Sequence, residues 1–316
     1  MQTMSKEEAK ALVPFTPSLL KSAIQKSVRR GEIDKVVRAT KSLITLSETD
    51  ALRRLMIIPI EDCLLPPNYD KLAAMLMNVS SKGGEPLTEA EKTIALSIIG
   101  DAAKCGWRDL DIGNPSDEGK DYVMRPVKGS KENDLVNALL YRSRIGGSKW
   151  DFWMLTGMAR AWNKRFAEGS WTAEKLKQYF TGEVIEWNDV PYATVDDILI
   201  ESVDMHCSGI LHLLLKIGWV KDLLRREIPF NKRDWLGGDV SDLNLLEQVV
   251  WCMRSSVNPK KNIWKTQVGK DQPVSWLWAD NVPEAMWPVY EHITEAIREE
   301  TDSISRWIIR TQGEKV

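Results

Sequence analysis

The sequence has little histidine and little cysteine, which limits the chemistry that it can carry. Three histidines occur in 316 residues, and there are four cysteines, at Cys63, Cys105, Cys207 and Cys252. Since no two cysteines form a C-x-x-C pair, neither a zinc framework nor a disulfide scaffold is indicated. We therefore predict reduced and mostly buried thiols, no metal and no cofactor. Such thiols are typical of a cytosolic or nuclear protein, and a cytoplasmic location is expected.

Nucleotide-binding loops and long apolar runs are also missing. Neither G-x-x-x-x-G-K-[S/T] nor G-x-G-x-x-G occurs, so an ATPase or a nucleotide-dependent dehydrogenase lacks its main sequence support. The stretch 1–15 is charged and has no apolar region of the kind found in signal peptides. Apolar runs such as GILHLLLKIGWV (209–220) are too short and too interrupted to cross a bilayer. We expect a soluble protein with no membrane partner.

Strand-like alternation is nearly absent, whereas helical spacing is common. The short stretches Tyr122–Met124 and Val184–Glu186 are the only candidate strands, and the hydrophobic content of 43% is typical of a folded protein. The predicted fold is all-α and multi-helix. We expect an N-terminal helical bundle over 1–109 and a Gly/Pro/Asp/Ser-rich loop or linker over 110–131. A helical domain over 132–316 would then hold all but Trp107 of the fourteen tryptophans, most of them in the core.

The start of the bundle has clear helix signals. Thr16 and Pro17 predict an N-cap and a first helical position, and Gly31 predicts the end of that helix. The next helix has a one-sided apolar stripe between 33 and 44, and Thr88 with Glu91 predicts a capping box further along. In the first two helices the cations are expected on the solvent side; these are Lys21, Lys26, Arg29, Arg30, Lys35, Arg38 and Lys41.

A third segment carries two charged pairs. Arg53-Arg54 and Glu61-Asp62 lie about two turns apart, and Pro59 between them is expected to kink the helix. The two pairs cannot meet within one straight helix. We therefore expect them to pair with neighbouring helices and so to fix how three helices cross.

The stretch LLKSAIQKSVRRGEIDKVVRA, followed by LRRLMIIPIEDCLL, resembles the C-terminal helical region of clamp-loader-like AAA+ ATPases of the WHIP type. The resemblance covers about 17–77, and the matching residues are Lys26, Arg29, Arg30, Gly31, Arg53, Arg54, Glu61 and Asp62. It implies helical packing with self-association or partner binding. Because no ATPase module precedes it in this sequence, ATP hydrolysis and DNA remodelling are not implied.

Two later elements combine tryptophan with cations. The first, over 225–235, contains Arg225, Arg226, Lys232 and Arg233; the second, over 251–265, contains Trp251, Arg254, Lys260, Lys261 and Trp264. Such elements can stack bases and neutralise phosphates, although a helix C-terminus followed by a surface loop has the same composition. Together with Lys26, Arg29, Arg30, Arg53 and Arg54, they are our candidates for binding nucleic acid or a partner. The net charge of −2 gives no global attraction to phosphate.

Catalytic candidates are few. Asp197, Glu201 and Asp204 would share one face of a helix predicted over 194–216, with His206 nearby. Such a row could hold Mg²⁺ or serve acid–base chemistry, or it could be a solvated face or a partner for arginines. Cys207 is predicted as a small core residue rather than a nucleophile, because adjacent helical residues diverge by about 100°.

These observations favour a non-enzymatic, all-α interaction protein linked to nucleic-acid metabolism. It would bind nucleic acid or a nucleic-acid-processing complex, and a phage or a mobile element is a source that fits it. We expect a protein partner or self-association, with nucleic acid as a further candidate partner. Two alternatives stay open: a metal-dependent enzyme using the Asp197/Glu201/Asp204 row, and a purely protein-binding inhibitor or adaptor.

Overall fold

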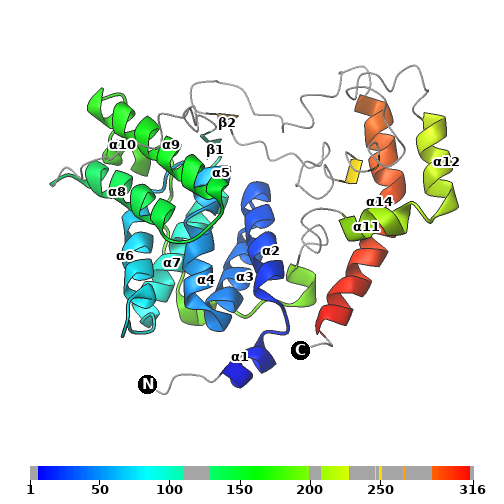
Figure 1. Ribbon diagram of the computed structural model, residues 1–316, viewed down its shortest axis with the longest axis horizontal. Helices are drawn as coiled ribbons and strands as arrows, with labels where there is room; N and C mark the ends of the chain where they lie inside the picture. The colour runs from blue at the N-terminus through cyan, green and yellow to red at the C-terminus, as the bar shows by residue number, and fades with distance from the viewer. Residues whose placement is uncertain are drawn as a thin grey trace.

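A computed structural model of the chain describes residues 6–109, 129–198, 208–227, 246, 249–250, 266–267 and 287–313. Across these residues the protein is almost wholly helical (Figure 1), which confirms the all-α prediction. Two strands are described, β1 (Trp107–Arg108) and β2 (Thr266–Gln267), and they pair in parallel. Val184–Glu186 forms no strand, and Tyr122–Met124 lies outside the described residues. None of the described helices has the length and apolar character needed to cross a membrane.

The larger group of helices contains the first half of the chain and extends to residue 198. Its α-helices are α1 (Lys6–Leu12), α2 (Pro17–Arg30), α3 (Ile33–Leu46), α4 (Glu48–Leu55), α5 (Ile58–Asp62), α6 (Tyr69–Ser80), α7 (Glu89–Lys104), α8 (Lys131–Arg144), α9 (Lys149–Ala167) and α10 (Ala173–Lys177). Two 3₁₀ turns follow, η2 (Trp187–Asp189) and η3 (Val195–Asp197). α2 and α3 form a hairpin against α7, α4 packs on α3 and α6, α8 packs on α6, and α9 packs on α8.

The local signals in the sequence account for several helix ends. Thr16 Oγ1 accepts the amide of Leu19 at 3.3 Å, and Gly31 ends α2 with a left-handed φ of 68°. Thr88 forms the expected capping box at the start of α7. Pro59 does more than kink the third segment: α4 ends at Leu55 and α5 begins at Ile58, with the proline in its first turn.

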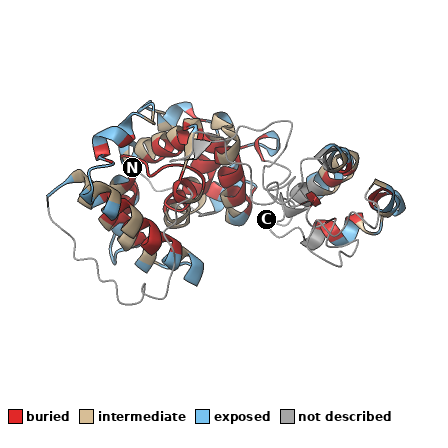
Figure 2. Ribbon diagram, turned by 90° about the horizontal axis from the view of Figure 1, so that it is seen from above, coloured by how far each residue is buried: buried red, intermediate tan, exposed pale blue. Residues whose placement is uncertain are grey.

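One hydrophobic core runs through the larger group. Its buried residues begin at Val13 and end at Ile198, and they include Leu135 to Leu139 from α8 and Trp162 from α9. Figure 2 shows these buried residues along the inner sides of the helices. The core therefore contains residues from both sides of the predicted linker over 110–131. The division into domains stays a prediction.

A mostly extended strap, residues 181–197, contains the turns η2 and η3, and its first part runs antiparallel to α7. Backbone amides of the strap donate to α7 side chains in sequence: Gly182 to Asp101 at 2.9 Å, Ile185 to Ser97 at 2.9 Å and Trp187 to Thr93 at 3.0 Å. Because the side chains of α7 satisfy these backbone groups, the strap needs no sheet or helix of its own.

Apolar and charged contacts hold the same strap against α3. Ile185 packs beside Gly100, where an added Cβ would lie 2.4 Å from Ile185 Cδ1. Lys41 Nζ donates to the carbonyls of Trp187 at 2.9 Å and Val190 at 2.7 Å, and lies 4.9 Å from the Trp187 ring centroid. The expectation that Lys41 faces solvent is therefore wrong, because the strap covers it and leaves it 8% exposed.

A second, smaller group contains α11 (Ser208–Leu214), α12 (Gly218–Glu227) and α14 (Trp287–Gly313). Both α11 and α12 pack on α14, and Figure 1 shows this group apart from the larger one. Its described buried residues include Leu214, Val220, Leu224, Ile293 and Ile297.

Candidate nucleic-acid interface

Asp62 is fully buried at the end of α5, and three side chains hold its carboxylate. Arg29 Nε of α2 lies 2.6 Å from Oδ1, Arg108 Nη2 of β1 lies 3.6 Å from the same atom, and Gln25 Nε2 donates to Oδ2 at 2.9 Å. Burial alone would raise the pKa of Asp62, but the charges of Arg29 and Arg108 hold it below its ordinary value. Asp62 is thus an ionised, paired group that joins α2, α5 and β1.

Glu61, its neighbour, completes the cluster from the other side. Its carboxylate accepts Gln25 Nε2 at 2.6 Å, and Arg54 of α4 donates to the Gln25 side-chain oxygen. Burial raises the pKa of Glu61, and the adjacent charge of Asp62 raises it further. The cluster therefore links α2, α4 and α5, which confirms that Arg54, Glu61 and Asp62 pair with neighbouring helices.

Two cations of α2, Lys26 and Arg29, are less accessible to solvent than the helical spacing predicts. Lys26 is 7% exposed and donates to Ser22 Oγ at 2.9 Å, so the expectation that it faces solvent is wrong. Arg29 is largely covered because its guanidinium reaches inward to Asp62. Both side chains are long enough to bend back over the helix, and helical spacing alone does not reveal this. Arg30 is half-buried at the end of α2.

The most exposed aromatic side chains of the larger group stand at the start of α9. Trp150 is 53% exposed and Trp153 is 43% exposed, and at a spacing of i, i+3 they share one side of the helix. The opposite side packs into the core through Leu155, Met158 and Trp162. Phe152, between them in the sequence, is 38% exposed.

The turn between α8 and α9 directly precedes these tryptophans and is held at the end of α4. Arg142 donates to the carbonyl of Arg53 at 3.1 Å, of Ile145 at 3.1 Å and of Gly146 at 2.9 Å. Burial lowers the pKa of Arg142; Tyr69 and the carboxylate of Asp151 raise it, and the charges of Arg53 and Arg54 lower it. The hydrogen bonds of Arg142 thus join the end of α4 and the turn before α9 into one region.

We call this region the α9 surface and define it by Arg53, Arg144, Lys149, Trp150 and Trp153. Arg144 and Lys149 are exposed, and Arg53 is half-buried. The Nε atom of Arg53 is enclosed and has no hydrogen-bond partner in the described part of the chain.

Of the carboxylate row predicted for a helix over 194–216, the described part of the chain contains Asp197. It ends the short turn η3, and Ile198 after it is extended rather than helical. The Asp197 carboxylate accepts the Thr194 amide at 2.8 Å and pairs with Arg38 at 3.0 Å. It caps its own turn and fastens the strap to α3. Glu201, Asp204, His206 and Cys207 lie outside the described residues.

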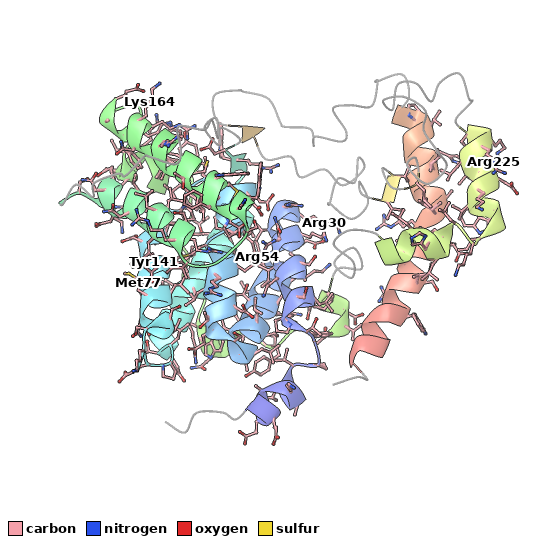
Figure 3. All side chains as sticks on the ribbon, viewed as in Figure 1. Arg30, Arg54, Met77, Tyr141, Lys164 and Arg225 are labelled. Carbon is pink, nitrogen blue, oxygen red and sulfur yellow. The ribbon has the colours of Figure 1, made fainter. Side chains whose placement is uncertain are left out.

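The later basic elements are described in part. Arg225 and Arg226 lie on α12, where Arg226 pairs with Glu227 at 2.8 Å. Figure 3 shows Arg225 on the smaller group, away from Arg30 and Arg54 on the larger one. The other candidates lie outside the described residues; these are Lys232, Arg233, Trp251, Arg254, Lys260, Lys261 and Trp264.

The α9 surface is not among the sites predicted from the sequence. Its signal is present in Lys149, Trp150 and Trp153, which interleave cation and aromatic residues at the start of a helix. The sequence pattern favours the core for most tryptophans, because burial is the usual use of a large aromatic side chain. No group of three or more metal-ligating side chains is found within the described ranges. Comparison of the chain with protein-family models, with curated proteins and with solved structures found no match.

Proposed function

We propose that the protein binds single-stranded nucleic acid through the α9 surface, as a non-enzymatic helical protein of nucleic-acid metabolism. The observation that carries this proposal is the pair Trp150 and Trp153, two exposed tryptophans one helical turn apart, bordered by exposed Lys149 and Arg144. Aromatic side chains stack on bases of any sequence, while nearby cations neutralise the phosphates between those bases.

The same geometry favours single strands over duplexes. Stacking on Trp150 or Trp153 needs a base whose face is free, and a duplex offers its base faces only at its ends. Each stacked base contributes about 1–3 kcal/mol. The cations add a salt-dependent term that acts on either form of nucleic acid.

The test is fluorescence anisotropy with labelled single-stranded oligonucleotides and matched duplexes. With about three phosphates neutralised by the three cations of the α9 surface, we expect affinity to fall roughly 20-fold between 50 and 200 mM salt. Trp150→Ala with Trp153→Ala should remove about 2–6 kcal/mol of binding free energy, or roughly 30-fold at least. Because both side chains are exposed, the double variant should keep the stability of the parent chain.

Trp219→Ala and Trp307→Ala are the matched controls, because these tryptophans are 40% and 63% exposed on the smaller group of helices. They should leave oligonucleotide affinity unchanged. Absence of binding at 50 mM salt would overturn the proposal. So would a double variant that binds normally. If the double variant instead changes the oligomeric state of a chain that binds no oligonucleotide, the α9 surface is a contact between proteins.

A further inference from the structure

A groove of about 540 Å³ lies between α6 and α8. From α8 it is lined by Asp134, Asn137, Ala138, Leu140, Tyr141 and Arg144, and from α6 by Asp70, Ala73 and Met77. Its size lies within the range of pockets that hold small ligands. No residue of the groove takes part in the buried charge cluster described above.

The polar, aromatic and cationic side chains that line the groove follow one another along α8. Asp134, Asn137, Tyr141 and Arg144 follow one another at spacings of three or four residues, so they lie on one side of the helix. A carboxylate and an amide therefore stand at one end, an aromatic ring in the middle and an exposed cation at the other end. The rise from Asp134 to Arg144 is about 15 Å.

The wall from α6 supplies apolar contact. Met77 is 46% exposed, and Figure 3 shows it next to Tyr141. Ala73 and Ala138 are each 4% exposed and form a floor of small side chains that allows close approach. Asp70 is already paired with Lys131 at 2.6 Å, which leaves Asp134 as the exposed carboxylate of this end.

We propose that this groove binds an adenine nucleotide, with the base between Tyr141 and Met77, its amino edge toward Asn137 and Asp134, and its phosphate at Arg144. An asparagine amide can accept from adenine N6 and donate to N7, and a carboxylate accepts from an amino group. Uracil and thymine present a carbonyl where adenine has its amino group, so they would face Asp134 with an acceptor.

The inference rests on the proposed function in one respect, which is the direction of the bound nucleotide. Arg144 belongs both to the groove and to the α9 surface, since only the turn 145–148 separates it from Lys149. A strand that crosses the α9 surface could therefore place one unstacked adenosine in the groove. The recognition of the free mononucleotide does not need that strand.

The experiment titrates the full chain with adenosine 5′-monophosphate and with uridine 5′-monophosphate, followed by calorimetry. We expect adenosine monophosphate to bind about 5- to 150-fold more tightly, because one well-placed amide contributes about 1–3 kcal/mol of discrimination. Asn137→Ala should abolish this preference, and Tyr141→Leu should weaken both nucleotides. Asn163→Ala, an asparagine of α9 outside the groove, is the control and should change neither affinity.

The two proposals fail in different ways. Equal affinity for the two mononucleotides, or no binding of either, overturns the groove proposal even when single strands bind the α9 surface. A retained preference in Asn137→Ala overturns it as well. The double variant of Trp150 and Trp153 should keep its affinity for adenosine monophosphate while it loses oligonucleotides, and loss of both would show that the groove has no separate site.

Discussion

Removal of the charge of Asp62 and removal of the charge of Glu61 should have different effects on the stability of the protein. Asp62→Asn leaves Arg29 and Arg108 buried without their anion, whereas Glu61→Gln removes a charge that its surroundings disfavour. Removing one partner of a buried ion pair costs about 3–5 kcal/mol. We therefore expect Asp62→Asn to lose about that much stability at pH 7 and Glu61→Gln to keep or gain stability.

The pH dependence of stability shows independently whether each carboxylate stabilises or destabilises the fold. The folded pKa of Asp62 lies below 3.8, so its contribution is present above that value and is lost as pH falls through the folded pKa. The folded pKa of Glu61 lies above 4.5, so its ionisation lowers stability as pH rises from 4.5 through the folded pKa. The difference between Glu61→Gln and the parent chain should thus grow with pH across that window.

Urea unfolding followed by circular dichroism measures both effects. With a dependence on urea of about 3 kcal/mol per molar, Asp62→Asn should lower the midpoint by roughly 1–2 M. Glu61→Gln is the matched control, because it changes the adjacent residue by the same chemistry. The reasoning is refuted if the two variants lose equal stability, or if Glu61→Gln is less stable than Asp62→Asn.

Two further predictions concern contacts between distant segments. Gly100→Ala should raise the unfolding midpoint by less than the helix propensity of alanine, about 1 kcal/mol, would give, since the new Cβ would meet Ile185 Cδ1 at 2.4 Å and the end of that side chain must turn away; Gly106→Ala, with open space around it, should be neutral in the same urea titration. Arg142→Lys should weaken oligonucleotide binding with little change in charge, because lysine cannot reach three carbonyls at once; unchanged affinity would show that the turn before α9 holds its position without this arginine.

The helices of the first hundred residues were predictable because their signals are local. Thr16, Gly31 and Thr88 act within a few residues of where they stand, and the apolar spacing of α2 and α3 repeats over several turns. The burial of the Lys26 and Lys41 side chains was not predictable in this way. Helical periodicity assigns a direction to each side chain, but the strap that covers Lys41 is about 150 residues away in sequence.

The candidate site was harder to predict for the same reason. The α9 surface joins the end of α4 to the start of α9, and the hydrogen bonds of the Arg142 side chain to the backbone of both segments bring them together. Asp197 shows the opposite case: its spacing from Glu201 fits a helix, yet its bonds to Thr194 and Arg38 belong to a turn. Short polar side chains near a possible cap compete with helix continuation, and the pattern alone does not show which wins.

The strap along α7 also sets an order of events during synthesis of the chain. Thr93 and Ser97 receive their partners from residues 94 and 88 positions later, and Leu96 is covered with a similar delay; Val37 of α3 is covered by the same strap. At about 5–20 residues per second, roughly 4–20 s pass between the appearance of α7 and the arrival of its cover. Through that interval the nascent bundle presents an uncovered apolar strip, so a chaperone or an early partner would meet the protein at α3 and α7.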